Sequence, residues 1–400
     1  MSGPLAGLRV LDVGTRISAP FCAGLLGEQG AEVIKVEQPG SGDFMRGIGP
    51  FLDTAEGPYS LFWSVEGRGR KSVTIDLRGD RGRDLFRRLA ATADVVCENF
   101  RPGTMEKWGI GPADLDPRIV MVRISAFGQD GPNSLRPGLD RLGIGYGGLL
   151  HLTGDPDRPP VRPGVTTSDY LTGTFAAQAA LAALYRRDAG PRATGRGAVI
   201  DACLYGSILR ILEWTIAGYD RLGVVRGREG NRLSTSAPLD NYPTADGRYV
   251  CLVAGSDANY ARLCHAMERT DLIDDPRFAT LAERAGRADE INGIVADWTS
   301  SLTASEVEAA AILHDVPVAT AYTAADITSD AHMAARSDLV VVDDPVAGPV
   351  RQQAPFPRYV GEESTVPTGA PRLGADTRAV LGSIGVEAAE LDELAAAGII

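Results

Sequence analysis

Short apolar runs alternate with segments of helical periodicity through the first 220 residues of the chain. The apolar runs predict buried parallel strands at residues 8–13, 31–37, 72–77, 94–97, 119–125 and 199–202. Apolar residues recur at helical spacing in four other segments, which predicts helices over 19–29, 80–91, 168–185 and 205–219. This βαβ alternation with short connections predicts an α/β fold, in which an open and mostly parallel sheet is covered by helices.

The pattern changes after residue 220. Residues 221–238 are rich in Arg, Gly and Ser, which is typical of a connecting segment. Residues 242–253 predict a β-hairpin that turns at Asp246-Gly247, and mostly helical segments follow. A chain of 400 residues favours two domains. We predict a large Rossmann-like domain over 1–220, a linker and smaller α+β domain over 221–330, and a return segment over 331–400 that completes the large domain.

Composition narrows the class of protein. The formal charge of −12 argues against the basic face that nucleic acid requires. No apolar stretch reaches the roughly 18–20 residues of a membrane span, and the first residues lack the features of a secretion signal. The five cysteines are scattered without a CxxC pair, which is typical of reduced thiols. We therefore expect a cytoplasmic enzyme that binds neither nucleic acid nor membrane.

Common cofactor motifs are absent from the sequence. The four histidines show no HExxH spacing, and neither a GxSxG elbow nor a Walker A loop occurs. Gly143-x-Gly145-x-x-Gly148 satisfies the GxGxxG pattern, but it follows a polar loop rather than a strand. That context favours a tightly packed helix entry over a dinucleotide site. No metal and no tightly bound cofactor are expected, and carboxylate chemistry remains.

Asp169 is the carboxylate of greatest interest, because it stands at the start of the long predicted helix. Two interpretations are open from its position. Ser168 or Asp169 can cap the helix by accepting hydrogen bonds from its first N–H groups, which is the more common role. Alternatively, the helix N-terminus keeps Asp169 ionised and directs it as a nucleophile.

Several blocks of sequence resemble the class III coenzyme A transferases of the CaiB/BaiF type, the family of formyl-CoA transferase and carnitine CoA-transferase. Residues 4–43 are similar to the family's first βαβ unit and its I-K-x-E-x-P-x-x-G-D turn. The most specific block is DVVCENFRPG at 94–103. Further matches are RGRKSVTIDL at 68–77, SAFGQDGPNSLRPG at 125–138 and TSDYLTG at 167–173. The resemblance covers essentially the whole chain.

The resemblance implies an enzyme that moves coenzyme A from an acyl-CoA donor, with succinyl-CoA one candidate, to a carboxylic acid. Asp169 would be the nucleophile, and it would pass through an aspartyl anhydride and an aspartyl-CoA thioester. The coenzyme A thioester is then a substrate. Gly255 and Ser256 would supply backbone donors near the developing oxyanion. The family's homodimers, in which two chains interlock as rings, are expected for this chain too.

Residues that would contact coenzyme A also follow from the resemblance. Arg78, Arg101 and Lys107 would bind its phosphates or adenosine through charge-assisted hydrogen bonds. The complete expected set is Ile17, Ser18, Gln38, Ile75, Asp76, Leu77, Arg78, Asn99, Phe100, Arg101, Lys107, Pro137, Gly138, Leu139 and Asp140.

Departures from the family's patterns define the alternatives. Formyl-CoA transferases carry glutamine, arginine and tyrosine where this chain has Ile17, Gln38 and Leu139, so oxalate is not the expected acceptor. The α-methylacyl-CoA racemases share the fold and place a proton-transferring histidine at the position of Leu139, which cannot transfer a proton. A CoA-thioester racemase and a non-catalytic CoA-binding protein remain the alternative hypotheses.

Overall fold

The computed structural model describes residues 3–189, 193–362 and 366–400. The chain forms two compact units, which we describe separately. The large unit comprises Met1–Leu149, Pro163–Ile216 and Met333–Ile400, and the small unit comprises Leu150–Arg162 and Ala217–His332. Residues 150–162 thus group with the small unit, whereas the sequence analysis assigned them to the large domain.

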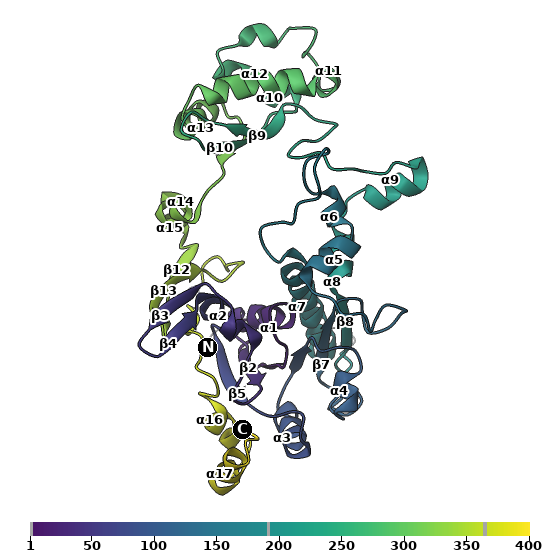
Figure 1. The fold of residues 1–400 in the computed structure, drawn as a ribbon, viewed down its shortest axis with the longest axis vertical. Coiled ribbons are helices and arrows are strands. Elements are labelled where there is room, and N and C mark those ends of the chain that lie inside the picture. Colours follow the sequence, from purple (N-terminus) through teal and green to yellow (C-terminus); the bar gives the residue numbers. More distant parts are fainter. Residues whose placement is uncertain (1–2, 190–192, 363–365) are drawn as a thin grey trace. The chain divides into compact units, whose positions relative to one another are not determined.

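The large unit is built around a six-stranded sheet (Figure 1). Its strands are β1 (Arg9–Asp12), β2 (Glu32–Glu37), β5 (Arg70–Thr74), β6 (Val95–Glu98), β7 (Val120–Ser125) and β8 (Val199–Cys203). They pair in the order β5-β2-β1-β6-β7-β8, and every pair is parallel, which confirms the predicted parallel sheet. The direction of winding reverses between β1 and β6. In open α/β sheets, such a switch point lies beside the ligand site, at the carboxyl ends of the strands.

Helices cover both faces of this sheet, because the strands are apolar on both sides. Val10 of β1 contributes to the cluster on one face, and the next residue, Leu11, contributes to the cluster on the other. The first face is covered by α1 (Ser18–Glu28) and α7 (Thr167–Asp188). The second is covered by three helices, α3 (Asp80–Ala90), α16 (Thr377–Ser383) and α17 (Ala388–Ala396). Continuous apolar strands are thus explained by burial on two sides.

Shorter elements complete the large unit. The helices are η1 (Phe44–Gly47), α2 (Leu61–Glu66), α4 (Thr104–Lys107), α5 (Asp140–Tyr146) and α8 (Leu204–Arg210). Two antiparallel hairpins consist of β3 (Phe51–Thr54) with β4 (Gly57–Ser60), and of β12 (Leu339–Asp344) with β13 (Gly348–Gln353). Strand β13 lies in a Pro-rich stretch, and its side chains alternate only weakly between apolar and polar.

The predicted helix over residues 205–219 is wrong. The structure has two helices there, α8 and α9 (Thr215–Leu222). Between them, Glu213 adopts a φ of 51°, in the left-handed region, which interrupts a right-handed helix.

The GxGxxG pattern lies in α5 and the residues after it, where two of its helical neighbours pack closely. A Cβ atom on Gly143 would lie 2.8 Å from the Leu204 Cβ and 2.8 Å from the Ser168 Oγ. A glycine is therefore required by the close approach of α8 and α7. This packing agrees with the helix-entry interpretation of the motif.

The small unit contains a three-stranded antiparallel sheet in the order β11-β10-β9. Its strands are β9 (Leu239–Pro243), β10 (Tyr249–Val253) and β11 (Val318–Thr320). The predicted hairpin between β9 and β10 is confirmed, and Gly247 in its turn has a φ of 74°. Its helices are α10 (Asp257–Ala266), η2 (Thr270–Leu272), α11 (Leu281–Gly286), α12 (Ala288–Ser300), α13 (Ala304–Leu313) and α14 (Ala324–Ser329). Boundaries between the two units along the chain fall within α6 (Leu149–Leu152), α9 and α15 (Ala331–Arg336). In the part of the chain that the structure describes, no helix combines the length and apolar character needed to cross a bilayer.

Candidate active site

The residues expected to contact coenzyme A gather along the carboxyl edge of the large unit's sheet. Each stretch follows a strand of the sheet. Residues 17–18 come after β1, residue 38 after β2, residues 75–78 after β5 and residues 99–101 after β6, and residues 137–140 end the loop after β7. Because the strands are parallel, all of these loops leave the same edge of the sheet. Lys107 differs, since it ends α4. The structure therefore brings most of the predicted set together around the switch point.

Asp169 lies in the first turn of α7, but it does not cap the helix. The N-cap residue is Thr166, whose side chain makes no capping hydrogen bond. Asp140 takes over part of that role: the Ser168 N–H donates to its Oδ1 at 2.8 Å, and the Ser168 hydroxyl lies 3.0 Å from the same oxygen. A buried carboxylate thus satisfies one backbone N–H group at the start of α7. The capping interpretation of Ser168 and Asp169 is wrong, and Asp169 is left available for chemistry.

The environment of Asp169 makes it a more basic carboxylate than usual. Burial and the nearby charge of Asp140 raise the pKa of the Asp169 carboxyl to about 7. The Ser18 hydroxyl and the Arg16 guanidinium oppose this rise by favouring the ionised form. A carboxyl with a pKa near neutrality is a stronger nucleophile when ionised and remains partly ionised at pH 7.

The N-terminal turn of α1 packs directly against the turn of α7 that carries Asp169. A Cβ atom on Gly173 would lie 2.8 Å from the backbone oxygen of Ser18, so the two helices approach through a glycine. One turn earlier, the rings of Phe21 and Tyr170 meet edge to face, with centroids 4.8 Å apart. The first residues of α1 therefore form one wall beside Asp169.

Asn99 fixes the loop that leads into α1. Its Oδ1 accepts from the Thr15 N–H at 2.9 Å, and its Nδ2 donates to the Thr15 oxygen at 2.7 Å and lies 3.3 Å from the Ser18 Oγ. These contacts join the loop after β6 to the loop after β1, across the switch point. The Asn99 side chain therefore positions Ser18, and its contact with coenzyme A stays a prediction.

The other expected residues divide by exposure. Arg78, Arg101 and Lys107 are exposed, and no ion pair involves them within the described ranges. Such cations are suited to bind phosphate groups. The side chains of Ile75 and Leu77, in contrast, are buried in the apolar core under α3. The remaining members are the buried Ile17 and the partly or fully exposed Gln38, Asp76, Phe100, Pro137, Gly138 and Leu139.

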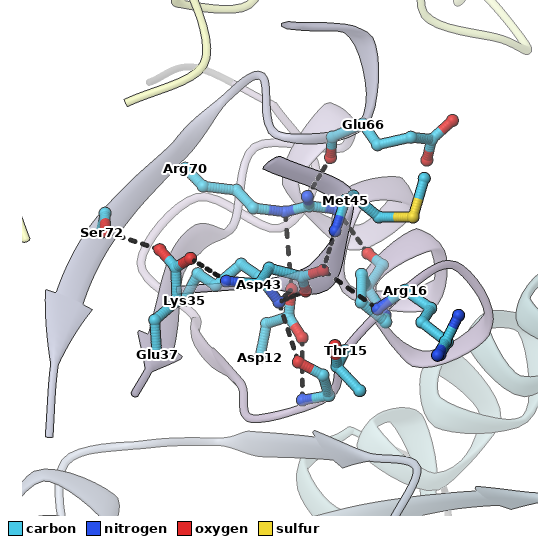
Figure 2. Close-up of polar contacts among 12 residues, drawn as sticks. Asp12, Thr15, Arg16, Lys35, Glu37, Asp43, Met45, Glu66, Arg70 and Ser72 are labelled. Atoms are coloured by element: carbon cyan, nitrogen blue, oxygen red, sulfur yellow. Dashed lines mark hydrogen bonds and ion pairs between the residues drawn. The ribbon is translucent and has the colours of Figure 1, made fainter. Parts of the chain in front are cut away.

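A group of buried charges beneath the edge was not singled out in the sequence analysis. We call it the ion cluster, and Figure 2 shows its centre: Asp12, Lys35, Glu37, Asp43 and Arg70. The Lys35 Nζ lies 2.8 Å from the Asp43 Oδ2 and 3.3 Å from the Asp12 Oδ2, and all three side chains are excluded from solvent. It also donates to the Gly14 oxygen at 2.9 Å.

The charges of the ion cluster keep Lys35 protonated. Burial alone would lower the pKa of its ammonium, but the charges of Asp12, Asp43 and Glu37 outweigh burial and raise that pKa. The sequence signal that could have revealed the cluster is the pair Lys35 and Glu37 among the apolar residues Val33, Ile34 and Val36 of one strand. Charged residues in a fully buried strand must be paired, because isolated buried charges are too costly.

Gly255 and Ser256, expected to provide oxyanion donors, lie in the small unit. The Ser256 hydroxyl caps α10 by accepting from the Asn259 N–H at 3.2 Å. A Cβ atom on Gly255 would lie 1.8 Å from the Ser236 Oγ, so only glycine fits there. The Gly255 oxygen accepts from the Arg284 Nη2 at 2.7 Å. This turn is therefore tightly built, and its catalytic role stays a prediction.

Comparison with known proteins identifies the family. Residues 5–377 match the model of CoA-transferase family III. Succinyl-CoA–D-citramalate CoA-transferase of Chloroflexus aurantiacus is 40% identical, over 94% of this chain and 93% of that protein. The beta subunit of succinyl-CoA–L-malate CoA-transferase from the same organism is also 40% identical, over 95% and 94%. A crystal structure of a CaiB/BaiF family protein from Brucella suis superposes with a TM-score of 0.85 at 30% identity, and covers 96% of this chain and 100% of that one. The family predicted from the motifs is confirmed: this chain is a CoA-transferase of family III.

Proposed function

We propose that this protein transfers coenzyme A from succinyl-CoA to a short dicarboxylic acid, with Asp169 as the nucleophile. The observation that carries the proposal is the Asp169 carboxyl, half-buried in the first turn of α7 at the carboxyl edge, with its pKa raised to about 7. The two relatives described above are named for succinyl-CoA as donor and for citramalate or malate as acceptor. Each of these acids, and succinate itself, carries two carboxylates.

In the first half-reaction, the ionised Asp169 attacks the thioester carbonyl of succinyl-CoA. A C–O bond forms, the C–S bond breaks, and the CoA thiolate leaves a mixed aspartyl–succinyl anhydride. The thiolate then attacks the aspartyl carbonyl, a C–S bond forms, and succinate departs as the C–O bond to it breaks. The product is an aspartyl-CoA thioester, and no net proton is exchanged.

The second half-reaction repeats these steps in reverse with the acceptor. The acceptor carboxylate attacks the aspartyl-CoA carbonyl and expels the thiolate, which forms a second anhydride. The thiolate attacks the acceptor's carbonyl carbon, so the acyl-CoA product forms and the Asp169 carboxylate is restored. Each attack develops negative charge on a carbonyl oxygen, for which we propose donors from the Gly255–Ser256 turn.

Coenzyme A would lie along the carboxyl edge. We propose that the exposed side chains of Arg78, Arg101 and Lys107 bind its phosphates, because none of them has a carboxylate partner within the described ranges. The ammonium and guanidinium groups would form charge-assisted hydrogen bonds with the phosphate oxygens. The acyl end would then be directed toward Asp169 and the N-terminal turn of α1.

We also propose that the chain works as a homodimer with interlocked rings. In the segment 209–225, large apolar side chains are exposed in succession: Leu209, Ile211, Trp214, Ile216, Tyr219, Leu222, Val224 and Val225. A run of exposed apolar residues of this size is typical of an interface. Native mass spectrometry that finds a monomer at micromolar concentration would contradict this assembly.

The function is tested by trapping the covalent intermediate. The protein is mixed with succinyl-CoA, treated with hydroxylamine or borohydride, digested, and analysed by mass spectrometry. We expect a modified peptide that contains Asp169, which is absent in Asp169→Ala and present in Asp84→Asn, a control at an exposed position of α3. No adduct with any acyl-CoA, together with exchange of the α-hydrogen in deuterated water, would instead support a racemase.

A further inference from the structure

The loop between β1 and α1 is held by buried side chains, and it presents one arginine in a strained conformation. The backbone of residues 14–16 is fixed by Asn99 and by the ion cluster. The Arg16 N–H donates to the Asp43 Oδ1 at 3.1 Å, and Asp43 is itself paired with Lys35. Arg16 has a φ of 67°, in the left-handed region. Such strain persists only where the surroundings enforce it, most often at functional sites.

The side chain of Arg16 lies outside the ion cluster that holds its backbone. Figure 2 shows it extending away from Lys35 and Asp43. The Arg16 Cζ lies 3.8 Å from the centroid of the Phe44 ring in η1, so the guanidinium stacks on an aromatic face. In the ranges 3–189, 193–362 and 366–400, no carboxylate pairs with this guanidinium and no hydrogen bond involves it. The loop therefore presents a cation without a counter-ion.

The loop that carries this cation leads into the turn of α1 that packs on α7 beside the nucleophile. Ser18, two residues after Arg16, contacts α7 at Gly173, one turn from Asp169. The charge of Arg16 acts on Asp169 and favours its ionised form, yet the two side chains do not form an ion pair. The guanidinium therefore lies within electrostatic range of Asp169, and its N–H groups are not occupied by Asp169 itself.

We propose that Arg16 binds the distal carboxylate of a dicarboxylic acyl group, both in the succinyl donor and in the acceptor acid. The inference deepens the proposed function and rests on it. When the reacting carbonyl is at Asp169, only two methylene groups separate it from the second carboxylate of a succinyl group. A guanidinium is planar and presents paired N–H donors that match a carboxylate, and the Phe44 ring packs against the guanidinium of Arg16. Arg16 is therefore a specificity-determining residue that selects diacids over monoacids.

The experiment measures binding of two unreactive thioethers by isothermal titration calorimetry. S-(3-carboxypropyl)-CoA retains the distal carboxylate, and S-butyl-CoA replaces it with a methyl group. We expect the wild type to bind the carboxylate compound about 10- to 100-fold more tightly, as for a charged hydrogen-bonded pair. In Arg16→Gln, this preference should fall below about threefold, while the affinity for S-butyl-CoA changes by less than about threefold.

Two further variants make the result decisive. Arg118→Gln removes an exposed arginine from the opposite edge of the sheet, before β7, and should keep the full preference. Arg16→Lys retains the charge but lacks the paired N–H donors, so its preference for the carboxylate compound should be at least threefold weaker than that of the wild type. This variant provides the test if Arg16→Gln does not fold. A preference that is unchanged in the Arg16 variants, or an equal loss of affinity for both thioethers, overturns the proposal.

The thioether experiment is independent of catalysis, so its failure differs from failure of the proposed function. A wild-type preference that depends on Arg16, without any trapped adduct on Asp169, supports the diacid site and refutes the covalent mechanism. A trapped adduct without an Arg16-dependent preference supports the mechanism and overturns the role of Arg16. Equal affinity of the wild type for both thioethers also overturns it.

Discussion

Replacing Asp169 with asparagine should stabilise the folded protein at pH 8 and leave its stability nearly unchanged at pH 4. Burial and the charge of Asp140 raise the pKa of the Asp169 carboxyl from 3.8 to about 7. Between these pH values, the unfolded chain has released the proton and the folded protein retains it, so the free energy of unfolding falls as pH rises. Asparagine has a similar size and no proton to release, so this loss of stability disappears in the variant.

The size of the effect follows from the interval between the two pKa values. At about 1.4 kcal/mol for each pH unit, the interval from 3.8 to about 7 corresponds to ~4 kcal/mol. Asp169 is only partly buried, so solvent screening reduces this value. We expect Asp169→Asn to be about 2–4 kcal/mol more stable than the wild type above pH 7, and the difference to shrink toward zero near pH 4.

The assay is urea-induced unfolding followed by circular dichroism at pH values from 4 to 9. Wild type, Asp169→Asn and Asp84→Asn are compared, since Asp84 is an exposed carboxylate in α3 and reports the general effect of removing one charge. A stability difference for Asp169→Asn that does not change with pH would refute the reasoning, and so would a variant less stable than the wild type at pH 8.

Three other perturbations give separate expectations. The kcat/KM for succinyl-CoA should fall about tenfold per pH unit below an apparent pKa near 7, because Asp169 must be ionised. Asp140→Asn removes a like charge, so it should move the acidic side of this pH profile about one pH unit lower. Identical pH profiles of the wild type and Asp140→Asn would contradict this expectation. Lys35→Met should lower the free energy of unfolding by about 3–5 kcal/mol, measured by urea titration, because it leaves buried carboxylates unpaired. Gly173→Ala should cost about 1–3 kcal/mol and lower kcat, since the new Cβ would meet the Ser18 oxygen at 2.8 Å; an unchanged enzyme would show that α1 can move away freely.

Local periodicity was sufficient for the six strands of the parallel sheet and for three of the helices that cover it, α1, α3 and α7. A strand buried on both faces carries consecutive apolar residues, as Val95-Val96-Cys97 of β6 and Val120-Met121-Val122 of β7 show, and this pattern needs no knowledge of the neighbouring segments. The predicted helix over 205–219 is wrong because the break between α8 and α9 depends on the left-handed backbone of Glu213. Side-chain hydrophobicity does not indicate that conformation. The family and the candidate nucleophile followed from blocks of sequence, since residue type and order are preserved within a motif.

The sequence by itself thus determined the parallel sheet, the family and the identity of Asp169 as the candidate nucleophile. Only the tertiary structure decided the electrostatics of the site, because Asp140 and Ser18 are distant from Asp169 along the chain and meet it through the packing of α5 and α1 on α7. The ion cluster likewise draws on β1, β2, β5 and the start of η1. Charge interactions depend on separation in space and on burial, and neither quantity is contained in the local order of residues.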